Sequence, residues 1–192
     1  IAMLVAWTLG EAALGLAAGL ATAWISEVFT IGAQALSVQA GYSFASSFDP
    51  NTQADSGILQ IFAQLTAGLL FFATGLDRQL IRAFALSMET CPPGSFVLHV
   101  SMAEMLIRLG SEAFSLAVRI ALPVIGLLFV VDLAMGILGR LNQQMQIISL
   151  SFPVKMLVSL AMLATIATAF PLLYTQQSAR VLQVIGTIFS RH

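Results

Sequence analysis

The sequence predicts an all-α integral membrane protein built from helical hairpins. Only 9% of its 192 residues are charged and 58% are hydrophobic, whereas a soluble domain has about 25% charged residues. Between residues 122 and 173, two long apolar runs flank the short polar turn Arg140–Gln146. The second run exceeds, and the first approaches, the ~20 apolar residues that a helix needs to cross ~30 Å of hydrocarbon. So short a turn allows only an antiparallel helical hairpin.

Composition and motifs argue against an enzyme or a nucleic-acid-binding protein. The net charge is −1 and no basic block occurs, which disfavours nucleic acid as a partner. The sequence contains no phosphate-binding loop and no GxGxxG, HExxH or CxxC motif. One of its two histidines is C-terminal, so His99 has no second ligand nearby and general-base catalysis has few candidates. We therefore expect a non-enzymatic protein with no catalytic, cofactor-binding or metal-binding residues.

The apolar runs predict a single helical membrane domain with four consecutive parts. Proline inside a helix removes a backbone hydrogen bond, so Pro123 and Pro153 are expected to kink or locally unwind the helices of the C-terminal hairpin. The four parts are the N-terminal helices with a polar loop (1–57), the middle helices (58–111), the C-terminal hairpin (112–173) and a short tail (174–192).

The middle part predicts one clean span followed by shorter helices. Residues 58–76 carry no charge, and the segment after them could stay helical to about Thr90, before Cys91-Pro92-Pro93-Gly94 ends it. Residues 96–109 are amphipathic. Their Glu104 and Arg108, four positions apart, could form an ion pair.

Small residues form a stripe along the first apolar run. They recur at steps of three and four, and two of them make a GxxxG motif, which lets another helix backbone approach closely. GxxxG is common by chance in apolar helices, so an intersubunit face and ordinary internal packing both remain open. Glu11 lies deep in the same run and needs a partner or water. The stripe consists of Ala12, Gly15, Gly19 and Ala23.

Each arm of the hairpin carries one charge within its apolar run. Asp132 lies 11 residues before Gln143 and Lys155 lies 12 residues after it, so a tight hairpin brings them to about the same depth. A lone Asp or Lys in the middle of a membrane helix costs ~2.5–3.5 kcal/mol. We expect the two side chains to be buried and to face each other or other polar groups, although each could instead snorkel to an interface. Arg119, near the start of the hairpin, is a further candidate buried charge.

Charge asymmetry predicts the orientation of the chain. If every apolar run crosses the membrane, the loop 49–57 and the turn 140–146 share one side, where Arg140 is the only basic residue. The positive-inside rule places the other side in the cytoplasm. That side carries Arg78, Arg82, Arg108, Arg180 and Arg191.

Three motifs stand in an order and spacing that resemble one family. They are LPVIGLLFVVDLAMGILGRLNQQMQI, then FPVKMLV, and upstream of both GYSFASSFDP at residues 41–50. These motifs resemble the FliR family of flagellar biosynthesis proteins, the T component of type III secretion export gates. The resemblance covers most of the chain from about Gly32. Because Ile1 already lies inside a hydrophobic run, one or two N-terminal helices of the family are expected to be missing.

The resemblance implies a subunit of a hetero-oligomeric, helical export gate. One copy would join several copies of the FliP-type and FliQ-type membrane subunits, with an FlhB-type switch protein packed outside. Unfolded flagellar proteins would pass through the centre, driven by a cytoplasmic ATPase and the proton-motive force. The expected location is the bacterial inner membrane, at the flagellar basal body, in contact with lipid. No cofactor is implied.

The resemblance also assigns a gate. In that family the loop that matches residues 41–57 plugs the pore, which makes Phe44, Phe48 and the Asp49-Pro50 turn the gate candidates. Bulky aromatic rings can seal a narrow pore by packing and dewetting. Two phenylalanines four residues apart also share a helix face, so they could equally be part of a core.

A small secondary transporter or channel subunit is the alternative. Kinked helices and charges inside spans are typical of transporters, but the two halves of the sequence show no inverted repeat. A transporter would move a solute alone, whereas a gate subunit needs partners. Copurification with two other small hydrophobic proteins therefore distinguishes the two hypotheses.

Overall fold

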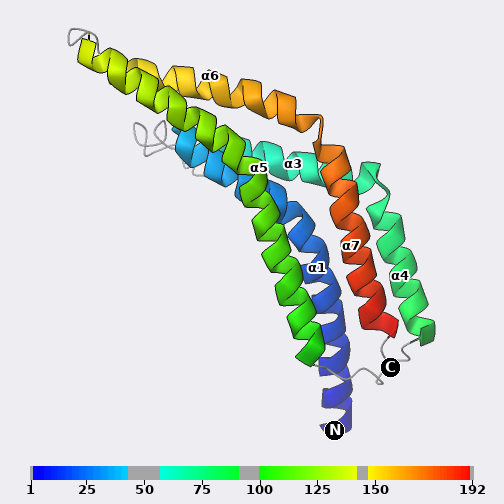
Figure 1. The fold of residues 1–192 in the computed structure, drawn as a ribbon. Helices are drawn as coiled ribbons and strands as arrows, with labels where there is room; N and C mark the ends of the chain where they lie inside the picture. Colours follow the sequence, from blue (N-terminus) through cyan, green and yellow to red (C-terminus); the bar gives the residue numbers. More distant parts are fainter. Residues whose placement is uncertain (1, 43–56, 91–99, 142–146, 191–192) are drawn as a thin grey trace, which may run out of the picture. The chain divides into compact units, whose positions relative to one another are not determined.

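The computed structural model describes residues 2–42, 57–90, 100–141 and 147–190. In these ranges the backbone is helical apart from short turns and contains no strand, which confirms the expected all-α fold (Figure 1). The helices are α1 (Ala2–Ala40), α3 (Ile58–Ala73), α4 (Leu76–Thr90), α5 (Val100–Leu141), α6 (Ile147–Ala167) and α7 (Phe170–Ser190).

Three of the described helices are long and apolar enough to cross a membrane, which agrees with the expected membrane protein. Their candidate spans are Met3–Ala40, Met102–Leu141 and Leu150–Ala167. The consecutive helices α3 and α4 pass the same test only as a pair, and they are bent by 61° at the break between them. Counting that pair as one broken span gives four.

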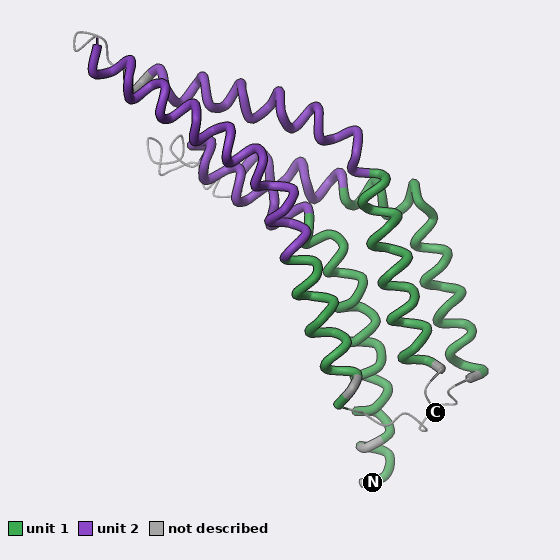
Figure 2. Tube along the Cα trace, in the orientation of Figure 1, with its two compact units in different colours: residues 1–28, 67–114, 171–192 green, residues 29–66, 115–170 purple. Residues whose placement is uncertain are grey.

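The chain divides into two compact units (Figure 2). The unit boundaries cut through α1, α3 and α5, so each unit is built from segments far apart in the sequence. The first unit comprises Ile1–Val28, Ala67–Phe114 and Pro171–His192, and the second comprises Phe29–Thr66 and Ser115–Phe170.

Aliphatic stripes and aromatic contacts form the core of the first unit. On α7, Val181 and Ile185 are almost fully buried and lie one turn apart, which is the spacing of one helix face. The rings of Phe84 on α4 and Phe189 on α7 lie 5.9 Å apart between centroids. The matching buried face of α1 consists of Leu14, Ala17, Ala18, Ala21 and Ile25.

Close approach of α1 and α5 forms the core of the second unit. A Cβ atom added to Gly32 would lie 3.7 Å from the carbonyl oxygen of Ala117, so the two backbones nearly touch. Phe29 and Phe170 meet edge to face, with ring centroids 5.2 Å apart. The buried face of α5 in this unit consists of Ala117, Ala121, Val124 and Leu128.

Several helix boundaries differ from those expected. Residues 100–109 of the expected amphipathic segment and the first arm of the hairpin belong to one helix, α5, which runs from Val100 to Leu141. The second arm ends at Ala167 rather than at residue 173, and α7 begins at Phe170. Pro171 explains this break, because proline disfavours helical conformation in the residue before it and is well tolerated in the first turn of a new helix.

A glycine interrupts the helices of the middle part ahead of Thr90. Gly75 has φ +69°, a conformation that favours glycine, and its amide donates to the carbonyl of Phe72 at 3.1 Å. It therefore ends α3 at Ala73, just before the end of the span expected over residues 58–76, and separates it from α4. By contrast, α5 continues through Pro123 and α6 through Pro153, and the kinks expected at these prolines stay predictions.

Candidate functional site

An ion pair links the two arms of the hairpin inside the second unit. The Nζ atom of Lys155 on α6 lies 2.9 Å from Oδ1 of Asp132 on α5 and 3.0 Å from its Oδ2. The Nε2 group of Gln39 on α1 donates to the same Oδ2 at 3.3 Å. Three helices thus meet on one carboxylate. Lys155 is buried, whereas the side chain of Asp132 is 35% exposed.

The register of the hairpin produces this contact. Asp132 lies nine residues before the end of α5 at Leu141, and Lys155 lies eight residues after the start of α6 at Ile147. When two antiparallel helices are joined by a short turn, residues at similar distances from the turn lie at the same level along the helix pair. Opposite charges at this level offset part of the desolvation cost that either would carry alone. Nothing in the sequence shows where the amide of Gln39 points, so its contact with Asp132 could not be predicted.

The end of α1 is fastened to α6 close to this pair. Gly41 has φ +82°, and a Cβ atom added to it would lie 2.5 Å from a ring carbon of Phe152. The hydroxyl of Tyr42 lies 3.3 Å from Oγ of Ser159 and 3.4 Å from the carbonyl oxygen of Met156. Ser159 is almost fully buried. Only glycine fits at position 41, since both the backbone conformation and the nearby ring exclude a side chain.

The gate candidates Phe44, Phe48, Asp49 and Pro50 lie outside the described residues. Tyr42 and Gly57 are the nearest described residues on either side of that segment, and both belong to the second unit. Tyr42 is held by α6, and a Cβ atom on Gly57 would lie 2.6 Å from Oγ of Ser37 on α1.

The remaining site candidates lie on the surface of this chain. Glu11 and Arg119, expected to be buried charges, are exposed in this chain. Their burial by a neighbouring subunit stays a prediction. The stripe of Ala12, Gly15, Gly19 and Ala23 is likewise exposed, and a Cβ atom added to either glycine would meet nothing within 4 Å. The stripe therefore packs against no other helix of this chain in the described structure, and the internal-packing alternative is not observed.

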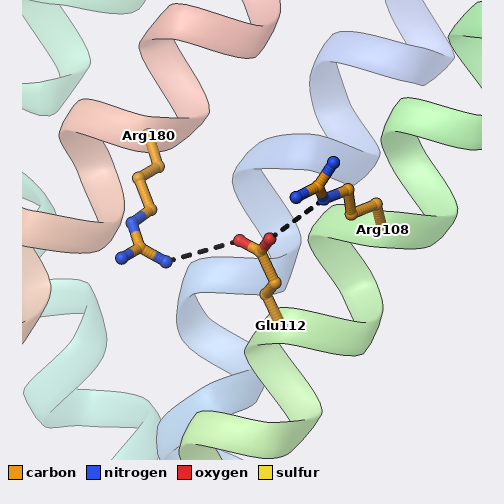
Figure 3. Close-up of polar contacts among 3 residues, drawn as sticks. All are labelled: Arg108, Glu112 and Arg180. Atoms are coloured by element: carbon orange, nitrogen blue, oxygen red, sulfur yellow. Dashed lines mark hydrogen bonds and ion pairs between the residues drawn. The ribbon is translucent and has the colours of Figure 1, made fainter.

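A second polar cluster lies in the first unit (Figure 3). The carboxylate of Glu112 on α5 lies between two arginines, with Nε of Arg108 3.3 Å from Oε1 and Nη1 of Arg180 on α7 3.3 Å from Oε2. The ion pair expected from the sequence joins Arg108 to Glu104, one turn earlier. Glu112 lies four residues after Arg108, and it is the residue that pairs with Arg108 in the structure. Arg180 lies 68 positions from Glu112, so no local spacing could predict that contact.

Comparison with known proteins identifies the family. A family model described as "Bacterial export proteins, family 1" matches residues 1–181. The chain belongs to this family. Among the curated relatives of this bacterial export family member are proteins named "Flagellar biosynthetic protein FliR". The relative from Caulobacter vibrioides is 26% identical over 174 residues, 91% of this chain and 69% of the relative.

Further relatives carry the same name. The protein from Escherichia coli strain K12 is 28% identical over 153 residues, 80% of this chain, and the one from Buchnera aphidicola of Acyrthosiphon pisum is 25% identical over 150 residues, 78% of this chain. The chain spans 59% and 58% of the length of these two relatives. The resemblance to FliR that the hairpin and loop motifs indicated is thereby confirmed.

Proposed function

We propose that this export-family chain is a core subunit of the flagellar type III protein export gate. With FliP-type and FliQ-type subunits it forms the channel through which unfolded flagellar proteins leave the cell, and an FlhB-type switch protein packs outside it. It acts in the inner membrane at the flagellar basal body and catalyses no reaction. The observation that carries the proposal is the family match over residues 1–181 together with the FliR relatives.

The exposed apolar surface supports a role inside a larger membrane assembly. In the three candidate spans, only 24%, 17% and 11% of the apolar window is buried within the described chain. Most of this surface must therefore face lipid or other subunits, since exposure of so much apolar surface to water is costly. The exposed stripe around Gly15 and Gly19 supplies a face where a partner helix can approach.

The fastening of α1 to α6 supports the assignment of residues 43–56 as the gate. Tyr42 and Gly57 flank this segment and contact α6 and α1 within one unit. A plug anchored at both ends can be displaced by a threading polypeptide and can return to the same place. Phe44 and Phe48 then provide the aromatic seal, and Asp49-Pro50 follows them in the sequence.

The proposal is tested by measuring export directly. Deleting the gene should abolish swimming and remove flagellar filament protein from the culture medium, and a plasmid copy should restore both. Cells that still release filament protein at the normal rate without this chain would contradict the proposal. A strain lacking filament protein itself is the control, because it loses swimming but keeps the export machinery.

A further inference from the structure

The groove between α5 and α7 in the first unit combines a positive rim with an apolar floor. It is a cavity of about 450 Å³. The guanidinium groups of Arg108 and Arg180 stand on either side of the single carboxylate of Glu112 (Figure 3), which leaves one net positive charge. The residues that line the groove are Met105, Arg108, Leu109, Glu112, Arg180, Gln183, Val184 and Thr187.

Both arginines keep hydrogen-bond donors available for a ligand. A guanidinium group has five N–H donors. Arg108 uses its Nε toward Glu112 and Arg180 uses one Nη group. Their side chains are 84% and 57% exposed, so the remaining donors face the outside of the chain. Arginine recognises phosphate by paired hydrogen bonds, and two arginines that line one groove can bind the same phosphate group.

The length of α5 places this groove near the membrane surface. The helix has 42 residues, which corresponds to about 63 Å at 1.5 Å per residue, twice the ~30 Å of hydrocarbon. Part of it must therefore lie outside the hydrocarbon. Residues 100–112 contain Glu104, Arg108 and Glu112, whereas residues 113–139 are apolar except for a few positions. The charged end is the part that reaches the level of the lipid head groups, on the side that the positive-inside rule places in the cytoplasm.

We propose that this groove binds an anionic phospholipid. The phosphate lies between Arg108 and Arg180, and the first part of an acyl chain lies along Met105, Leu109 and Val184. Basic pockets between membrane helices on the cytoplasmic side suit such head groups. The apolar floor favours a lipid over free phosphate, which has no apolar part. Glu112 lies between the two arginines and competes with the phosphate for them. Glu104, one turn before Arg108, does not line the groove. This site is independent of the proposed export function.

The test measures lipid retained by the purified full-length protein, with any subunits that copurify. The protein is incubated in detergent with equal amounts of phosphatidylglycerol and phosphatidylcholine, and bound lipids are counted by native mass spectrometry. The wild type should retain phosphatidylglycerol in preference. Arg108→Gln or Arg180→Gln should weaken that binding about fivefold each, the factor expected for one basic side chain near a membrane surface. Arg82→Gln, an exposed arginine on α4 outside the groove, should leave it unchanged.

A variant of Glu112 shows whether the two arginines act by binding the lipid or only through their ion pairs with Glu112. Glu112→Gln removes the same two ion pairs but keeps both arginines, so it should retain at least as much phosphatidylglycerol as the wild type. The proposal is overturned if the wild type shows no preference for phosphatidylglycerol, or if Glu112→Gln loses it as fully as the arginine variants. It is also overturned if a photoreactive residue at position 187 captures a partner protein in cells instead of lipid.

Discussion

Lys155 on α6 donates to the carboxylate of Asp132 on α5, with Nζ 2.9 Å from Oδ1. This contact fixes the axial register of the hairpin, because sliding one arm past the other would separate the two charges within an apolar setting. Gln39 joins α1 to the same carboxylate. The end of α1 is held to α6 a short distance along the chain by Gly41 and Tyr42. Polar contacts thus align α1, α5 and α6 within the second unit.

Removing one member of the ion pair should destabilise the protein more than removing both. Breaking a buried pair by one substitution costs about 3–5 kcal/mol, and we expect the lower end for Asp132→Leu or Lys155→Met, because the Asp132 side chain is 35% exposed. The double variant should be more stable than either single one. Thermal unfolding in detergent, followed by tryptophan fluorescence, measures the three values. Additive losses in the double variant would show that the two charges do not interact.

Gly41→Ala should disturb the junction of α1 and α6. Residue 41 has φ +82° and a methyl group there would meet the Phe152 ring, so we expect a loss of about 1–2 kcal/mol from the backbone conformation alone. Gly136→Ala is the matched control, since a Cβ atom there meets nothing within 4 Å and alanine favours the helix. Both are compared by the midpoint of thermal unfolding. Equal midpoints for the two variants would mean that position 41 tolerates a side chain.

Leucine at Gly15 or Gly19 should impair assembly while the chain itself folds. Nothing within 4 Å of either position obstructs a side chain in this chain, but a partner helix against the stripe could no longer approach closely. The measurement is the yield of complex on a native gel, relative to the amount of chain in the membrane. Gly68→Leu, which is also unobstructed, controls for the substitution itself. Normal complex yield from both stripe variants would rule out the stripe as an assembly face.

The predicted gate is tested by leakage. Phe44→Ala combined with Phe48→Ala, or deletion of residues 51–56, should leave the complex assembled but permeable to ions when no substrate is engaged, because the aromatic seal is lost. Phe72→Ala, an exposed ring on α3, is the control. Conductance of the purified complex in planar bilayers is the measurement. If the assembled double variant conducts no more than the wild type, those rings belong to the core and not to a plug.

The sequence predicted the parts of this structure that depend on composition and short-range spacing. Apolar length predicted the helices, and the near-equal distances of Asp132 and Lys155 from the turn indicated their contact. It did not predict the Arg180–Glu112 contact, which depends on how α5 and α7 pack. The breaks at Gly75 and before Pro171 had local signals, a glycine ahead of a charged segment and a proline within an apolar run. The length of the apolar runs predicted longer helices than those observed, so neither break was predicted.

The composition of the native complex tests the central claim most directly. The chain, tagged at one end, is purified from its own bacterium in mild detergent, and every subunit is identified by intact mass. A subunit of the export gate should copurify with two other small hydrophobic membrane proteins of the FliP and FliQ types, in a fixed ratio that survives size-exclusion chromatography. Recovery of the chain only as a homo-oligomer that moves a solute across vesicle membranes would contradict the claim and favour a transporter.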